Sequence, residues 1–249
     1  MYIPQHIIII GNGRFGALFY QILSKDFKVS VFDPSSTSTR IPLVQDLNEA
    51  IQVVDTIIYA IPINEFEPTL KTHAEDIYNH ITEPKVIMDV CSVKEHPLQV
   101  MKQYIKPPHK LLITHPMFGP VSYAENKGAE GLPFMMDQDN SDKEAFTAWF
   151  RYLTKKRFNV IQMSSEEHDR LAAASQGIAH FIGRGLERSG HTSTSIDTAS
   201  ARKLTEIQDS VSSDTFELFT NLQKYNRFAG EERKKLLKAL EDLDREVGR

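Results

Sequence analysis

The chain has 249 residues, of which 41% are hydrophobic and 25% charged, and its formal net charge is −4. This balance is ordinary for a globular protein, and it argues against a nucleic-acid-binding surface, which needs a surplus of Lys and Arg. No apolar run approaches the ~20 residues that span a bilayer, and the single cysteine excludes an internal disulfide. Residues 1–5 lack the basic segment and the long apolar segment of a secretion signal. We therefore expect a cytoplasmic protein.

A glycine motif follows the first predicted strand. The β-branched run at residues 6–10 predicts a buried parallel strand, and residues 11–16 fit G-x-G-x-x-G before helical spacing over residues 17–24. A second predicted strand at residues 27–32 ends on Asp33. A strand, this motif, a helix and an acid at the tip of the next strand together predict a dinucleotide-binding loop.

Each part of this loop has a physical role. Gly11 makes the tight turn, Gly13 lets the backbone approach the pyrophosphate, and Gly16 lets helix and strand pack closely, while the helix N-terminus offers amide donors to the phosphates. Asp33 would accept hydrogen bonds from the ribose and repel a 2′-phosphate, which favours NAD over NADP. NADP remains an alternative, because Arg40 and the polar residues 35–37 follow Asp33 and a rotated loop could still admit its 2′-phosphate. The predicted cofactor-binding residues here are Gly11, Asn12, Gly13, Arg14, Phe15, Gly16 and Asp33.

Further strands alternate with amphipathic helices, notably at residues 65–78 and 142–154. Such alternation predicts a doubly wound, mostly parallel sheet with helices on both faces. The strand at residues 53–60 breaks where we expect Ala60, Ile61 and Pro62 to cross the cofactor near its nicotinamide half. The remaining strands are predicted at residues 85–89, 111–113, 132–136 and 158–162.

Predicted strands stop at about residue 164. Helices are predicted at residues 164–188, 198–208, 214–225 and 231–247, and the last carries an apolar stripe that we interpret as core, with a dimer seam as the alternative. The stripe consists of Leu236, Leu240, Leu243 and Val247. We therefore predict an α/β protein: a Rossmann-type dinucleotide-binding domain over residues 1–163, followed by an all-α domain over residues 164–249.

His115 is the first candidate for chemistry. It follows the apolar run 111–113, so we expect it at the rim of the sheet, where open α/β sheets hold ligands. Pro116 and Pro120 stiffen the chain after it. A His-Pro pair alone is more often a structural turn. A functional role for His115 is favoured by two further segments, DVCSVK at residues 89–94 and SQGIAH at residues 175–180, the latter preceded by His168-Asp169.

Together with the glycine loop, these segments resemble the prephenate/arogenate dehydrogenase family of tyrosine biosynthesis, in particular its shorter plant-like branch. The resemblance runs from Gly11 to about Asn226, with looser matches at residues 196–198, 214–216 and 225–226. It departs from the family in two places. An arginine that the longer bacterial branch carries on a late helix has no clear counterpart near Ser210, and the chorismate mutase domain of enteric bifunctional members is absent.

The resemblance implies NAD-dependent oxidative decarboxylation of prephenate to 4-hydroxyphenylpyruvate, with arogenate, or both substrates, as the alternative and NADP less favoured than NAD. It implies His115 as the base that takes the proton of the ring hydroxyl, since an unperturbed imidazole titrates near ~6.5, and Ser92 as the group that orients it. A homodimer through the helical half is expected from the family, with a small-molecule substrate and no nucleic acid, membrane or metal.

The substrate contacts implied by the resemblance lie mainly in the helical half. Gln176 and His180 are four residues apart and share a helix face. The cations for the substrate carboxylates would be Arg184, Lys94 and Arg202, in that order. Asp214 would favour the ammonium of arogenate, although it equally fits the N-cap of its helix. The residues implied in substrate binding are Gln176, His180, Arg184, Lys94 and Asp214.

Two other functions remain open. A hydroxyacid or imine reductase of similar build would normally place a lysine or aspartate where this chain has Gln176 and His180. A non-enzymatic dinucleotide sensor would need only the segment from Gly11 to Asp33, without Ser92, His115 or His180.

Overall fold

The computed structural model describes residues 4–37, 41–80, 83–212 and 214–248. The chain divides into two compact units, residues 1–165 and 166–249. Within the described residues, no helix has the length and apolar composition needed to cross a membrane.

The first unit is built on one seven-stranded sheet in the order β2-β1-β3-β4-β5-β6-β7. All neighbouring strands are parallel except β5 and β6, which are antiparallel. The predicted mostly parallel, doubly wound sheet is therefore confirmed. Its strands are β1 (His6–Ile10), β2 (Lys28–Phe32), β3 (Thr56–Tyr59), β4 (Val86–Asp89), β5 (Lys110–Pro116), β6 (Pro133–Met136) and β7 (Asn159–Gln162).

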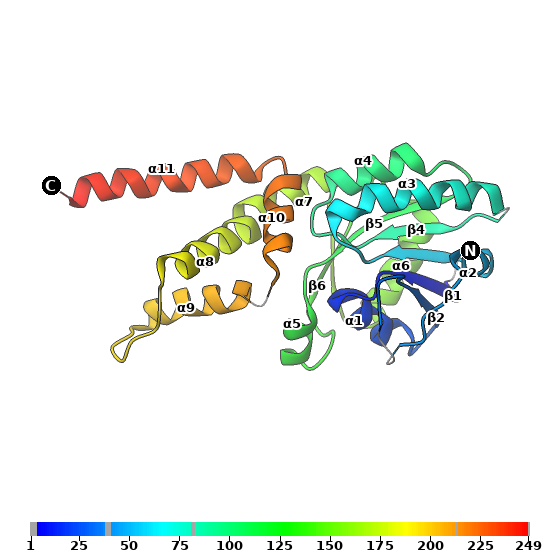
Figure 1. The fold of residues 1–249 in the computed structure, drawn as a ribbon, viewed down its shortest axis with the longest axis horizontal. Helices are drawn as coiled ribbons and strands as arrows, with labels where there is room; N and C mark the ends of the chain where they lie inside the picture. The colour runs from blue at the N-terminus through cyan, green and yellow to red at the C-terminus, as the bar shows by residue number, and fades with distance from the viewer. Residues whose placement is uncertain (1–3, 38–40, 81–82, 213, 249) are drawn as a thin grey trace. The chain divides into compact units, whose positions relative to one another are not determined.

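Helices cover both faces of this sheet (Figure 1), so β1 is buried on both sides and reads as an unbroken isoleucine run. On one face, Ile9 and Met88 belong to a core cluster with Trp149 of α6. The other face is covered by α3 and α4. The helices of this unit are α1 (Arg14–Leu23), α2 (Leu47–Val53), α3 (Ile63–His80), α4 (Glu95–Tyr104), α5 (Pro120–Glu125) and α6 (Lys143–Lys155).

Strand β5 is longer than predicted. The apolar run suggested an end at Ile113, with His115 at the rim, but the strand continues to Pro116. The extension pairs with β6, so that His115 lies opposite Met135, and the Met117 amide donates to the Pro133 carbonyl at 3.0 Å. His115 is therefore held by pairing with a strand about twenty residues later, which the local sequence does not reveal.

The second unit is helical, as predicted, but its first helix is not continuous. A π-helical segment, η1 (Ala173–Gly177), lies between α7 (Ser165–Ala172) and α8 (Ile178–Ser189), where one helix over residues 164–188 was expected. Gly183 of α8 packs against α9, because a Cβ there would lie 2.4 Å from Val211. The remaining helices are α9 (Ala199–Ser212), α10 (Phe216–Tyr225) and α11 (Ala229–Val247).

The apolar stripe of α11 does not form core in this chain. Leu240, Leu243 and Val247 are 53%, 55% and 82% exposed. The core interpretation is therefore wrong for these three residues, because no described element of the chain covers their side chains, whereas Leu236 is half-buried.

Candidate functional site

The glycine motif forms a tight loop between β1 and α1. Gly11 has a φ of +103°, and a Cβ there would lie 2.5 Å from the Ala60 carbonyl oxygen and 2.8 Å from Ile61. A Cβ on Gly16 would lie 2.1 Å from the Gly11 carbonyl oxygen. The structure thus brings the motif against Ala60 and Ile61, the residues expected to cross the cofactor, while Pro62 directly precedes α3.

The same loop is open on the side of the helix N-terminus. A Cβ on Gly13 would meet no atom within 4 Å, and Gly13 is exposed. No acidic side chain lies in the first turn of α1, and no side chain caps it. Asn12 contributes a buried Oδ1 without a partner among the described residues. Open amides at a helix N-terminus fit the pyrophosphate of a dinucleotide.

Asp33 ties the end of β2 to this loop. Its Oδ2 accepts from the Asn12 amide at 2.7 Å, and its Oδ1 accepts from the Ser35 amide and hydroxyl at 2.9 and 2.7 Å. Partial burial alone would raise the pKa of Asp33, but these hydrogen bonds outweigh it and lower the pKa. A carboxylate therefore stands beside the loop. Arg40, the predicted alternative contact for NADP, lies outside the described residues.

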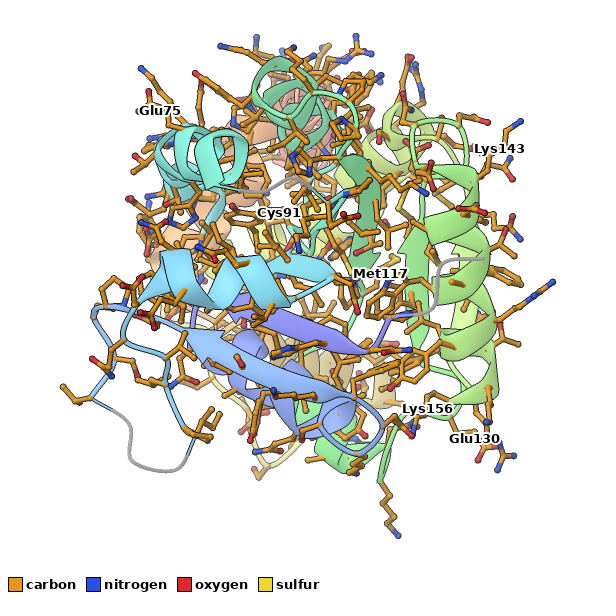
Figure 2. The ribbon with its side chains drawn as sticks, turned by 90° about the vertical axis from the view of Figure 1, so that its right-hand side faces the viewer. Glu75, Cys91, Met117, Glu130, Lys143 and Lys156 are labelled. Atoms are coloured by element: carbon orange, nitrogen blue, oxygen red, sulfur yellow. The ribbon has the colours of Figure 1, made fainter. Side chains whose placement is uncertain are left out.

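Two strand ends carry the candidate catalytic residues. Ser92 follows the end of β4 and is half-buried, and His115 lies in β5 and is 3% exposed. Because β1, β3, β4 and β5 are parallel, their carboxyl ends share one edge of the sheet with the glycine loop. Figure 2 labels Cys91 and Met117, which mark the segments after β4 and around the end of β5.

Aromatic packing connects the His115 segment to the glycine motif, which the sequence analysis did not anticipate. The ring of Phe15 lies 5.8 Å from that of Phe118, in an edge-to-face arrangement. Phe118 also stacks on Phe158 at 5.3 Å. Phe15 occupies an x position of G-x-G-x-x-G and lies about a hundred residues from Phe118 in the chain, so spacing alone gave no signal for the contact between them.

A buried ion pair links the segments that carry Ser92 and His115. Lys94 and Asp89 both have fully buried side chains, and the Lys94 ammonium donates to Asp89 Oδ2 and to the Thr114 carbonyl. Burial raises the pKa of Asp89, and the charge of Lys94 opposes that rise. Lys94, predicted as a substrate cation, therefore lies in the interior of its unit with its charge engaged there.

The second unit places Gln176 in the π-helical segment. Its Oε1 is buried and has no hydrogen-bond partner among the described residues. Gln223 of α10 donates to the Gly177 carbonyl at 2.8 Å and accepts from Arg233 of α11. π-Helical turns are frequent at functional sites because they displace one side chain from the regular helix face.

His180 and Asp214 are neighbours in this unit. His180 is 8% exposed, and its Nε2 lies 3.9 Å from Asp214 Oδ2, while its buried Nδ1 has no partner among the described residues. Burial lowers the pKa of His180; Asp214 opposes this and Arg184 adds to it. The lowered pKa therefore favours the neutral imidazole of His180.

Asp214 is not the cap of its helix, so that structural alternative is wrong. The N-cap of α10 is Thr215, whose hydroxyl accepts from the Leu218 amide at 3.1 Å. Arg184 donates to the Asp214 backbone carbonyl at 2.5 Å and to Glu187 at 2.8 Å, and its Nε is buried without a partner in the described part of the chain. Arg202 is exposed and donates to the Asp197 carbonyl at 3.0 Å.

No group of three or more His, Cys, Asp or Glu side chains within the described ranges is placed to hold a metal ion. The geometry instead offers a dinucleotide loop, a buried histidine and a separate polar cluster.

Comparison with known proteins identifies relatives of this chain. A family model described as the nucleotide-binding domain of prephenate dehydrogenase matches residues 36–162, just over half of the chain, and a TYRAAT1-like C-terminal domain model matches residues 185–248. Arogenate dehydrogenase 1, chloroplastic, of Arabidopsis thaliana is 29% identical, with 98% of this chain and 40% of that protein covered. Arogenate dehydrogenase 2, chloroplastic, of the same plant is 32% identical, with 78% and 54% covered.

The chain thus spans about half the length, or less, of these curated relatives. A crystal structure of prephenate dehydrogenase from A. aeolicus in complex with hydroxyphenyl propionate and NAD+ matches with a TM-score of 0.75 at 18% identity. It covers 98% of this chain and 91% of that one. At this identity the likeness concerns the fold.

Proposed function

The chain belongs to the prephenate dehydrogenase family, and we propose that it is a dehydrogenase that oxidises and decarboxylates a cyclohexadienyl substrate with NAD. The observation that carries the proposal is His115, a buried imidazole in a strand whose carboxyl end shares a sheet edge with the glycine loop. The Phe15–Phe118 contact links its segment to that loop.

His115 is suited to accept the proton of the hydroxyl at ring C4. An ordinary imidazole titrates near ~6.5, close to working pH, so its neutral form is available as a base. When bound, NAD supplies the hydride acceptor. Loss of the carboxylate at C1 as carbon dioxide makes the ring aromatic and provides the thermodynamic drive, so the protein mainly has to align the substrate and polarise its hydroxyl. Ser92 is proposed to orient His115 or that hydroxyl.

Substrate contacts are proposed for the polar cluster of the second unit. Gln176 Oε1, His180 Nδ1 and Arg184 Nε are each buried without a hydrogen-bond partner among the described residues. Buried polar atoms of this kind are costly unless something bonds to them. Arg184 is the proposed cation for a substrate carboxylate; Lys94 is not, because its ammonium is bonded to Asp89 and Thr114.

Of the two candidate substrates we propose arogenate, although the family resemblance alone favoured prephenate. Arogenate carries an ammonium where prephenate carries a keto group. The Asp214 carboxylate lies 3.9 Å from His180 Nε2, within the polar cluster proposed to bind the substrate, and a carboxylate there would attract an ammonium. The names of the two Arabidopsis relatives agree with this choice.

We propose NAD rather than NADP as the cofactor. The low pKa of Asp33 keeps a negative charge beside the glycine loop, which would repel a 2′-phosphate. Residues 35 and 36 are serines that bond to Asp33 and Asn12, and neither carries a positive charge.

A homodimer through the helical unit is also proposed. Leu240, Leu243 and Val247 of α11 form an exposed apolar stripe, and a second copy of the chain would cover it. Sedimentation of the wild-type chain and of Leu240→Glu tests this proposal. The substitution should shift the dimer towards monomer, and a monomeric wild type would contradict it.

Reduction of NAD in the presence of arogenate, and separately of prephenate, tests the proposed activity. NADH formation that depends on arogenate supports it. Binding of NAD without turnover of either compound would favour the dinucleotide sensor instead, and turnover of hydroxyacids or imines would favour the reductase alternative.

A further inference from the structure

Lys94 is an unusual residue to find in the interior of this protein. Its side chain is 0% exposed, as is that of Asp89, with which it pairs. Lysine is almost never fully buried unless it is paired, and a buried ion pair is often no more stabilising than well-packed apolar residues. Stability alone therefore gives little reason for a charged pair at this position.

The pair controls the residue that directly precedes His115. Each of the three polar groups of Thr114 is bonded to Asp89 or Lys94. The Thr114 amide donates to Asp89 Oδ1 at 3.3 Å, its carbonyl accepts from the Lys94 ammonium, and its hydroxyl donates to the Asp89 carbonyl at 2.6 Å. The backbone that delivers His115 is thus fixed from β4.

The same pair also closes the turn that carries Ser92. Asp89 Oδ2 accepts from the Cys91 amide at 3.1 Å and from the Lys94 ammonium. Ser92 lies between these two donors in the chain. One carboxylate therefore holds both sides of the turn, and Lys94 joins that turn to Thr114.

We propose that Lys94 and Asp89 are positioning residues that hold Ser92 and His115 in fixed relative placement at the carboxyl edge of the sheet. This inference rests on the proposed function, in which those two residues serve catalysis. Neither Lys94 nor Asp89 needs to touch the substrate, because both act through the backbone of Thr114 and of the turn at residues 91–93. Loss of the pair should therefore lower kcat more than it weakens binding.

Lys85 offers a matched control at the other end of the same strand. It precedes β4, is 4% exposed, and its ammonium donates to the carbonyls of Val54 and Gln52 at 2.5 and 3.1 Å. Lys85→Met and Lys94→Met each remove a buried ammonium next to β4. Only Lys94→Met removes one that is joined to Thr114.

Steady-state kinetics of the full chain with NAD and arogenate, or prephenate if that is the better substrate, provides the first test. Misplacement of catalytic groups by about 1 Å can cost ~100-fold, so we expect kcat of Lys94→Met to fall about 100-fold. KM and the Kd for NAD should stay within about threefold of wild type, as for loss of an interaction made in the transition state. Lys85→Met should keep the wild-type kcat in its folded fraction.

An NMR titration of the histidine side chains gives a second readout that needs no turnover. The His115 resonances, assigned from the spectrum of His115→Asn, should move and titrate at a different midpoint in Lys94→Met, but not in Lys85→Met. If the wild type turns over neither substrate, the proposed function fails while this comparison still tests the positioning pair.

The double variant Asp89→Asn/Lys94→Met is a control for misfolding of Lys94→Met, because it leaves no unpaired charge in the interior. It should fold and show the same loss of kcat and the same change at His115. The inference is overturned if either folded variant keeps the wild-type kcat and His115 titration. It is also overturned if neither variant folds while Lys85→Met does, since the pair would then be a folding requirement.

Discussion

Substitution of Asp214 by Asn removes a charge with almost no change in size, and under the proposed function it should change the preference between arogenate and prephenate. Two unit charges 4 Å apart interact by about 4 kcal/mol at an effective dielectric constant of about 20. The Asp214 side chain is 26% exposed, so solvent reduces this value. A charged hydrogen bond contributes about 1.5–3 kcal/mol, which corresponds to a loss of about 10- to 150-fold in kcat/KM for arogenate.

The assay compares kcat/KM for arogenate and for prephenate in the wild type and in Asp214→Asn. Prephenate has no ammonium, so its kcat/KM should stay the same or rise. Glu217→Gln removes an exposed acid from the first turn of the same helix and should leave the ratio of the two values unchanged. An equal fall for both substrates, or no fall for arogenate, would refute the role of Asp214 in recognising the ammonium.

Three further predictions follow from the geometry. Gly13→Ala should change the free energy of unfolding by less than about 1 kcal/mol, because its Cβ would meet no atom within 4 Å, but it should raise the Kd for NAD at least about tenfold. Gly16→Ala should lower the free energy of unfolding by about 2 kcal/mol or more, because its Cβ would overpack against the Gly11 carbonyl. Calorimetry of unfolding and of NAD binding distinguishes the two effects. Asp33→Asn should raise kcat/KM for NADP relative to NAD by about tenfold, and an unchanged ratio would contradict its role. Because burial holds the pKa of His180 below its ordinary 6.5, protonation of this residue favours the unfolded chain. Its contribution to the free energy of unfolding should be constant above about pH 6.5 and fall below it, by up to about 1.4 kcal/mol per pH unit. Chemical denaturation at several pH values should show a shallower fall in His180→Asn.

Local sequence patterns predicted most of the fold. The isoleucine run of β1 lies within the predicted range, because a strand covered on both faces must be apolar throughout. Local sequence patterns did not predict the features of the fold that tertiary contacts determine. The extension of β5 to Pro116 depends on pairing with β6, and the π-helical segment adds one residue to a helix turn without changing its composition.

The candidate site was predicted less completely. Motif spacing predicted the glycine loop, whereas the roles of His115, Asp214 and Lys94 came from the family resemblance. Lys94 is buried in an ion pair, and the sequence does not show burial. The contact between Phe15 and Phe118 joins two segments about a hundred residues apart, and no local pattern signals it. The stripe of α11 was interpreted as core because amphipathic spacing is the same whether a helix packs within its own chain or against another one.

His115 is proposed to remove the proton from the ring hydroxyl without taking part in cofactor binding. Turnover of His115→Asn with arogenate and NAD, measured beside NAD binding by titration calorimetry, separates these two functions. Turnover should fall at least about 100-fold, with the Kd for NAD close to that of the wild type. Turnover at the wild-type rate would show that His115 is not the base.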